Sequence, residues 1–139
     1  MADVRPPSNA VQAIAATALR AEQARMRIIA ENIANANSTS RSPGGDPYRR
    51  QVPVFEPVRT EAGQGVKMVR VLPDQSEFKT AYDPGHPSAD ANGYVKLPNV
   101  NTLIESLDMR SAQRAYEANL NVIETARAME LRTLDLIRK

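Results

Sequence analysis

The stretch RMRIIAENIANANSTS, residues 25–40, marks the end of a long helix and shows what kind of helix it is. Apolar side chains recur there at the spacing that places residues on one face of an α-helix: Met26, Ile29 and Ile33. Three asparagines then fall within six residues: Asn32, Asn35 and Asn37. Asparagine is unfavourable inside helices, because its side chain competes for nearby backbone groups. We therefore predict that the helix ends in this cluster.

The asparagine cluster allows two interpretations. Asparagine tolerates the left-handed backbone conformation that ends many helices, so the cluster can be a frayed helix end. Alternatively, Asn32 and Asn35 share one helix face beside Ile33, where amides next to an apolar row fix the register of packed helices. A similar combination recurs near the other end of the chain, at Tyr116 and Asn119.

The helix extends from this cluster back toward the N-terminus. Residues 8–37 contain neither glycine nor proline, and Ser8 or Asn9 can cap the helix after the two prolines that precede it. Leu19 continues the apolar row, and alanines widen it: Ala15, Ala18, Ala30 and Ala34. The pattern predicts one long amphipathic helix.

A second segment without glycine or proline spans residues 101–138, and Asn101 or Thr102 can cap it. One helix face carries Met109, Ala112, Tyr116, Leu120, Ile123, Leu134 and Ile137. A neighbouring face carries Ala115, Ala118, Val122, Ala126 and Met129. This apolar surface is broader than one partner helix covers, and the chain holds no other element large enough to bury it. We therefore expect burial against other subunits.

The middle of the chain has a different composition. All six glycines lie between residues 44 and 93, and eight of the ten prolines lie between residues 43 and 98. Short strands are predicted at residues 51–58, 66–72 and 78–82, followed by an extended arm that reaches the second helix. The predicted organisation is α+β: an N-terminal helical segment at 1–37, a β-rich middle domain with its arm at 38–100, and a C-terminal helical segment at 101–139.

Composition excludes several classes of function. The 139 residues carry a net charge of +2 without a basic block, so no nucleic-acid partner is expected. The chain has no cysteine, and its single histidine, His86, lacks the second ligand or nucleophile that a metal or catalytic site needs. We expect no catalytic residues, no cofactor, no metal and no small-molecule substrate. No run reaches the length of a membrane span, and a cleaved signal peptide is not expected, because Thr17 interrupts the apolar run and Arg20 follows it.

Two terminal segments resemble a known family. LRAEQARMRIIAENIANANSTS, residues 19–40, resembles the N-terminal signature of bacterial flagellar axial proteins, which centres here on Asn32-Ile33-Ala34-Asn35. SAQRAYEANLNVIETARAMELRTLDL, residues 111–136, resembles their C-terminal segment, although Gln113-Arg114-Ala115 departs from the common pattern without an expected consequence. The inserted SRSPGGDPYRRQVPVF, residues 40–55, and AYDPGHPSADANGYVKLPNVN, residues 81–101, resemble the proximal-rod type of this family.

The resemblance covers residues 12–139 and implies both an architecture and a function. The terminal helices are expected to pair as an antiparallel coiled coil, with the β-rich middle as a small outer domain. Copies are expected to assemble with other rod proteins into the helical rod that crosses the periplasm, transmits torque and surrounds the export channel. The flagellar type III apparatus is the expected exporter, without signal-peptide cleavage.

Two other classes of function remain open. A soluble helical adaptor or export chaperone of the type III system uses similar helices but normally lacks such a middle domain. A peripheral membrane protein calls for aromatic insertion residues, and the first helix has none.

The rod hypothesis assigns a set of residues to subunit interfaces. Small alanines let helices approach closely, while amide and tyrosine side chains among apolar residues fix the register. The hypothesised interface and register residues are Leu19, Met26, Ile29, Asn32, Ile33, Asn35, Met109, Tyr116, Asn119, Ile123 and Leu134.

Overall fold

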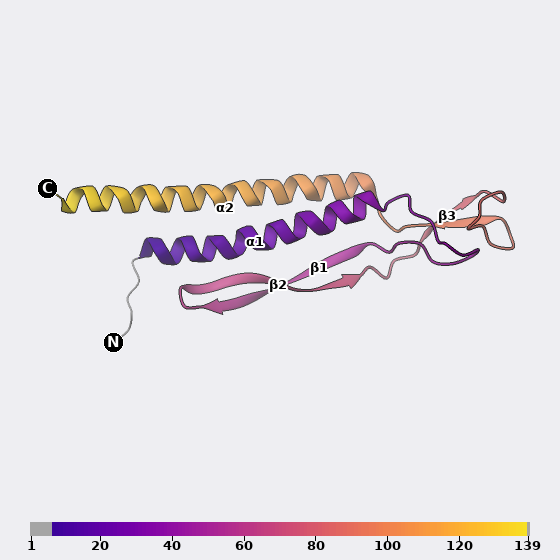
Figure 1. The fold of residues 1–139 in the computed structure, drawn as a ribbon, viewed down its shortest axis with the longest axis horizontal. Helices are drawn as coiled ribbons and strands as arrows, with labels where there is room; N and C mark the ends of the chain where they lie inside the picture. The colour runs from indigo at the N-terminus through magenta and orange to yellow at the C-terminus, as the bar shows by residue number, and fades with distance from the viewer. Residues whose placement is uncertain (1–6, 139) are drawn as a thin grey trace. The chain divides into compact units, whose positions relative to one another are not determined.

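The computed structural model describes the backbone of residues 7–138 and the side chains of residues 9–138. In chain order, the described part contains α1 (Pro7–Ala34), β1 (Gln51–Thr60), β2 (Gly63–Pro73), β3 (Lys79–Tyr82), β4 (Tyr94–Leu97) and α2 (Thr102–Ile137) (Figure 1). Two long helices thus flank a small antiparallel β region, which confirms the predicted α+β class.

The contacts within the chain group its residues into two compact units. The first unit combines residues up to 26 with residues 54–70 and residues from 111 onward. The second combines residues 27–53 with residues 71–110. These units divide the chain differently from the three expected segments, because both helices and both long strands continue from one unit into the other.

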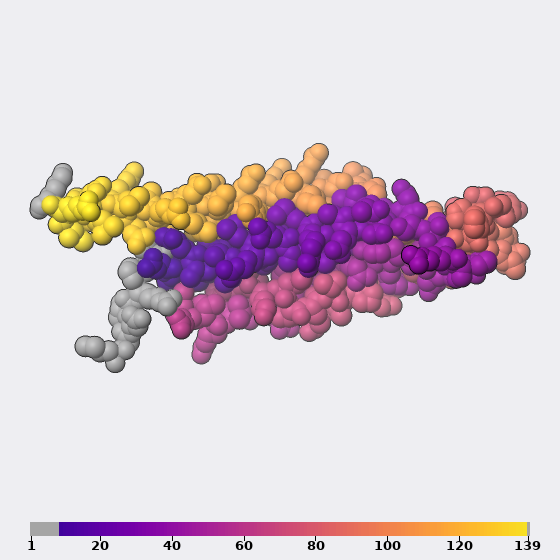
Figure 2. Space-filling view, in the orientation of Figure 1, coloured from indigo at the N-terminus to yellow at the C-terminus, as the bar shows by residue number. Residues whose placement is uncertain are grey.

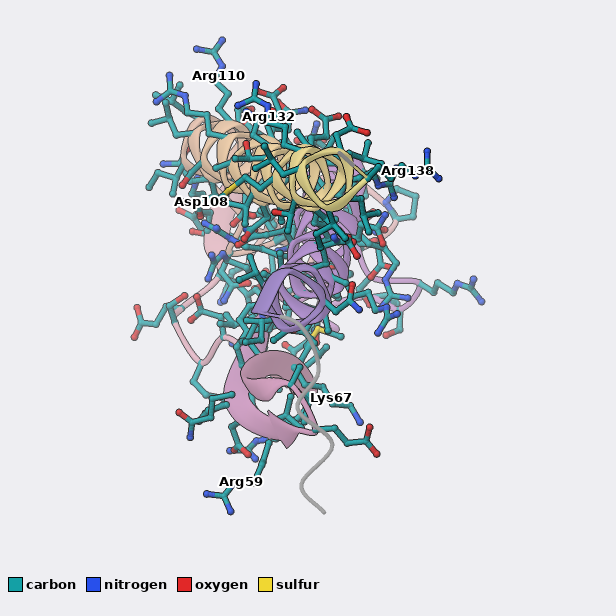
Figure 3. All side chains as sticks on the ribbon, turned by 90° about the vertical axis from the view of Figure 1, so that its left-hand side faces the viewer. Arg59, Lys67, Asp108, Arg110, Arg132 and Arg138 are labelled. Atoms are coloured by element: carbon teal, nitrogen blue, oxygen red, sulfur yellow. The ribbon has the colours of Figure 1, made fainter. Side chains whose placement is uncertain are left out.

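In the first unit, α1 lies between α2 and the hairpin of β1 and β2 (Figures 1 and 3). The two helices run antiparallel, and Gln12 Nε2 donates to Glu130 Oε2 across them at 3.4 Å. Buried or half-buried side chains recur along α2 at alternating spacings of four and three residues: Ala112, Tyr116, Asn119, Ile123, Ala126 and Glu130. This is the heptad spacing of coiled coils, and it places the row on the side of α2 that packs in the unit.

The hairpin is bound to the other side of α1 through Thr17. Its Oγ1 donates to the Ile14 carbonyl at 2.7 Å and accepts a hydrogen bond from the Val66 backbone N–H at 3.1 Å. The strand approaches so closely that a Cβ atom on Gly65 would lie 2.5 Å from Thr17 Oγ1. Arg59 points away from α1 on the far side of the hairpin (Figure 3). Glycine at residue 65 is therefore a condition of this contact.

In the second unit, β3 and β4 form an antiparallel pair with the register Lys79↔Leu97 to Tyr82↔Tyr94. The strand predicted at 78–82 is confirmed as β3, whereas β4 lies in the segment expected to be an unpaired arm. The rings of Tyr82 and Tyr94 meet edge to face, with their centroids 5.3 Å apart. Val95 and Val100, in this part of the chain, have buried apolar side chains.

The helix ends follow capping chemistry. Asn101 Oδ1 accepts from the backbone N–H groups of Leu103 and Ile104, which confirms Asn101 as the cap of α2. The first helix begins at Pro7, so Ser8 and Asn9 lie inside its first turn rather than at the cap position. It ends at Ala34, three residues earlier than predicted, because the chain turns at residues 35–37.

Candidate functional site

The side chain of Asn32 is 1% exposed and lies in the second unit at the end of α1. Its Oδ1 accepts hydrogen bonds from the Tyr48 hydroxyl at 2.7 Å and from the Gln51 backbone N–H at 2.9 Å. Its Nδ2 donates to the Gln51 carbonyl at 2.9 Å and to Glu105 Oε2 at 3.3 Å. The amide therefore binds the backbone of Gln51 on both its donor and its acceptor side, and so attaches the first residue of β1 to α1.

Glu105, in the first turn of α2, is also 1% exposed. Arg50 Nε donates to Glu105 Oε1, while Asn32 Nδ2 donates to the other carboxylate oxygen. A buried carboxylate is costly unless it is paired and hydrogen-bonded, and both conditions hold for Glu105. Its position near the N-terminus of α2 adds a favourable interaction with the helix dipole.

Arg50 connects several segments through its planar guanidinium group. Besides Glu105, its terminal nitrogens lie 3.3 Å from Asp74 Oδ2 and 3.9 Å from Asp108 Oδ2. Its backbone N–H donates to Asn99 Oδ1 at 2.7 Å, and its carbonyl accepts from the Asp74 backbone N–H at 2.8 Å. We call this group the Arg50 cluster: Asn32, Tyr48, Arg50, Gln51, Asp74, Asn99, Glu105 and Asp108.

Arg49, the residue before Arg50, binds the same loop to the backbone of the segment that follows β2. Arg49 donates to the carbonyls of Asp74 and Ser76 at 2.8 and 3.0 Å, and its guanidinium lies 4.2 Å from the centre of the Phe78 ring. At the start of the inserted segment, the Ser40 carbonyl accepts from Ser88 Oγ in the arm. The inserted segment is thus bound both to the arm and to the residues after β2.

The cluster shifts the pKa values of three of its members. Burial alone lowers the pKa of Arg50, but the hydrogen bond and charge of Glu105, and then those of Asp74, raise it above its usual value. Hydrogen bonds from Ser76 lower the pKa of Asp74, against a smaller opposing effect of burial, and the hydrogen bond and charge of Arg50 lower it further. Burial raises the pKa of the Tyr48 hydroxyl, as do the charges of Glu31 and Glu105. The guanidinium and the Asp74 carboxylate are therefore held in their charged forms at neutral pH.

The structure assigns the hypothesised interface residues to different surroundings. Ile29 and Asn32 are buried, and eight others are half-buried: Leu19, Met26, Ile33, Asn35, Met109, Tyr116, Asn119 and Ile123. Only Leu134 of this set is exposed, with 52% of its surface accessible. Asn35 and Asn119 donate to the carbonyls four residues earlier in their own helices, at 2.9 and 2.8 Å. Their role between subunits stays a prediction.

Sequence reasoning missed most of the Arg50 cluster. Arg50 lies 55 residues from Glu105 in the chain, and no local pattern joins them. One signal was present: Glu105 is four residues before Met109 and seven before Ala112, so an acidic residue occupies the apolar row of α2. In the first helical segment, Asn32 lies four residues after Ile28 and four before Ala36, so an amide likewise occupies the apolar row there. Charged or amide residues in an apolar row predict a buried polar contact, but not its partner.

The described residues do not form a cluster of metal ligands. Within residues 9–138, no group of three or more acidic, histidine or cysteine side chains is placed to hold a metal ion. His86 Nδ1 accepts from the Ser88 backbone N–H at 3.0 Å, which gives the single histidine a structural contact in its loop. No helix in the described range is long and apolar enough to span a bilayer.

The exposed surface of α2 is unusually apolar. Of the fifteen large apolar side chains that are exposed in residues 9–138, ten belong to α2. They concentrate toward its C-terminal end: Met129, Leu131, Leu134, Leu136 and Ile137. Figure 2 shows this end of the helix, in yellow, uncovered on the face in view. Large exposed apolar surfaces mark sites of protein association.

Two family models match the two ends of the chain. The model described as "Flagella basal body rod protein" matches residues 13–41, and the model described as "Flagellar basal body rod FlgEFG protein C-terminal" matches residues 91–136. The first match covers the end of α1 with Asn32, and the second covers β4, Glu105 and nearly all of α2.

Curated relatives match nearly the whole chain. A protein of Agrobacterium fabrum named "Flagellar basal-body rod protein FlgC" is 46% identical over 134 residues, which cover 95% of this chain and 96% of the relative. The protein of that name from Salmonella typhimurium is 45% identical over 126 residues, covering 88% and 92%. The one from Bacillus subtilis is 34% identical over 140 aligned residues, covering 88% and 93%.

Proposed function

Since the chain belongs to the FlgC family of flagellar basal-body rod proteins, we propose that it assembles with other rod proteins and with copies of itself into the helical proximal rod. The family makes it a structural subunit of the basal-body rod. In our proposal, the assembled rod crosses the periplasm, surrounds the export channel and transmits torque. The role involves no catalytic step, cofactor, nucleic acid or small-molecule substrate.

The observation that carries the proposal is the exposed apolar surface of α2. One side of α2 packs in the first unit, while ten large apolar side chains of the same helix remain exposed. Burying apolar surface contributes about 25 cal/mol per Å², so association of such helices with neighbouring subunits is strongly favoured. Contacts between different surfaces of successive copies do not close on themselves and generate helical filaments.

The proposed interface set divides according to exposure. Leu134 contacts a neighbouring subunit directly, because half of its surface is accessible. The ten buried or half-buried members, from Leu19 to Ile123, fix the packing of the helices that present this surface. The proposal also includes export by the flagellar type III apparatus without removal of a signal peptide.

The test is deletion of the gene, with the intact gene restored as the control. We expect the deletion strain to lose motility and to lack the rod in images of its basal bodies. The restored strain should regain both, and the chain should be detected in purified basal bodies. An export chaperone or adaptor would be needed for assembly but absent from the purified structure. Complete rods in the deletion strain would refute the proposal altogether.

A further inference from the structure

We propose that Arg50 is a positioning residue, which fixes the register between the end of α1 and the start of α2 so that the subunit can assemble. The inference rests on the proposed function and deepens it, because it identifies a buried contact that assembly requires. The contact lies wholly in the second unit and involves none of the exposed apolar residues of α2.

Arg50 and its partners connect four segments of the second unit. Asn32 comes from α1, Arg50 from the inserted loop, Asp74 from the residue after β2, and Glu105 from α2. Arg50 has charged partners on two of these segments and shares the Glu105 carboxylate with Asn32. Four segments therefore meet at one guanidinium–carboxylate pair. A shift of one helix along the other separates several of these hydrogen bonds at once.

The partners of Arg50 are arranged to suit a planar cation. The Arg50 nitrogens face three carboxylates, with Nε on Glu105 and the two terminal nitrogens toward Asp74 and Asp108. A guanidinium offers its donors in a fixed planar arrangement, whereas the ammonium group of lysine is a single point on a flexible stem. The angular arrangement of these partners thus calls for arginine, and charge alone does not satisfy it.

The energetics of a buried ion pair favour a role in positioning. Burying an ion pair costs desolvation that its attraction only partly offsets, so a neutral pair of similar volume is often equally stable. Removing one partner alone is different, because it leaves a buried, uncompensated charge. A pair of this kind adds little net stability, but it discriminates strongly against other alignments. Polar contacts in packed helices are best attested in this register-setting role.

The experiment compares three full-length variants with the parent chain. Arg50→Met leaves Glu105 buried without its cation. Arg50→Met combined with Glu105→Gln removes both charges, while the introduced amide can still accept from Asn32 Nδ2. Arg50→Lys keeps the charge and removes the planar group.

Lys96→Ala is the matched control, since Lys96 forms an exposed ion pair with Asp46 at 3.1 Å in the same unit. Each purified variant is unfolded in urea, and each is expressed in the deletion strain to score motility and basal bodies.

We expect Arg50→Met to raise the equilibrium constant for unfolding by about 100-fold or more, and the neutral pair to stay within about tenfold of the parent. Despite this stability, the neutral pair should lose rod assembly and motility. Arg50→Lys should fold and should show faster amide exchange at residues 48–51, together with reduced motility. Lys96→Ala should match the parent in every measurement.

Two results overturn the inference. If the neutral pair or Arg50→Lys restores full motility, register at this site does not depend on the arginine. If the neutral pair unfolds as readily as Arg50→Met, the ion pair supplies stability rather than positioning. Failure of the proposed function looks different, because complete rods would then form without any copy of the gene.

Discussion

At the scale of single residues, Asn32 differs from aspartate by one donor group, and that group makes two hydrogen bonds. Nδ2 donates to the Gln51 carbonyl and to the Glu105 carboxylate. In Asn32→Asp, a buried carboxylate would face both of these acceptors. We expect a loss of about 3 kcal/mol or more of unfolding free energy at neutral pH, measured by urea titration. Asn37→Asp is the control, because Asn37 is exposed and a change of about 0.5 kcal/mol or less is expected there.

The stability of the Asn32→Asp variant should depend on pH. Burial and the Glu105 charge raise the pKa of the introduced carboxyl in the folded state above its unfolded value. The folded state then binds more protons, so its stability falls as pH rises through this range and recovers as pH decreases. A deficit for Asn32→Asp that is equal at pH 7 and pH 5 would contradict the contact with Glu105.

The hydroxyl of Tyr48 should make the stability of the parent chain depend on pH in the alkaline range. Burial, together with the charges of Glu31 and Glu105, raises the pKa of its hydroxyl above the ordinary value of 10.0. The folded state therefore holds this proton where the unfolded state releases it. The stability from this difference is fully present below pH 10 and is lost as pH rises through the folded pKa.

Tyr48→Phe should reduce the decline of stability above pH 10, as measured by urea unfolding across pH 8 to 11. At neutral pH it should cost only about 1 kcal/mol, because Asn32 Oδ1 keeps its hydrogen bond from Gln51. Tyr82 is 68% exposed, so Tyr82→Phe serves as the control and should leave the alkaline decline unchanged. Parallel pH profiles for the parent and Tyr48→Phe would show that this hydroxyl does not contribute.

At the scale of elements, the turn into β4 depends on one glycine. Gly93 has φ of +84°, and a Cβ atom there would lie 3.0 Å from Tyr82 Cε2 and 3.1 Å from Pro84 Cβ. Gly93→Ala should therefore destabilise the second unit by about 1–3 kcal/mol, measured as a lower urea midpoint. Gly85→Ala, in the same loop before β4, is the control, because the nearest neighbouring atom to a Cβ there is 3.9 Å away. Equal midpoints for the two variants would rule out a strained turn.

Most of the helices and strands follow from local sequence patterns, but one strand and the Arg50 cluster do not. Helical periodicity and the distribution of glycine and proline predicted α1 and α2 to within a few residues, as well as β1, β2 and β3. The strand β4 was missed because it has only four residues, between Gly93 and Pro98, and its pairing with β3 is its main signal. The Arg50 cluster was missed for a similar reason, since Asn32 and Glu105, which share a hydrogen bond in it, lie 73 residues apart in the chain. Contacts over such separations depend on tertiary packing.

At the scale of the whole molecule, the two helices differ in how much of each is covered. In the first unit, α1 packs between the hairpin and α2, while the outer side of α2 packs against nothing in the described part of that unit. Toward the C-terminal end of α2, Leu131, Leu136 and Ile137 are 57%, 74% and 75% exposed. A subunit that folds before it assembles needs such a surface, because its stability then depends on the covered part of α2 and its association on the exposed part.

Leu134 tests this separation, since it was the exposed member of the interface set. Leu134→Asp adds a charge where apolar burial between subunits is proposed, but it removes little packing within the chain. We expect the unfolding free energy of the monomer to change by about 0.5 kcal/mol or less, and rod assembly and motility in the deletion strain to be lost. Asn121→Asp adds the same charge at another exposed position of α2 and should leave both unchanged. If Leu134→Asp assembles normally, the association surface lies elsewhere on α2; if it unfolds the monomer, Leu134 packs within the chain and does not belong to the association surface.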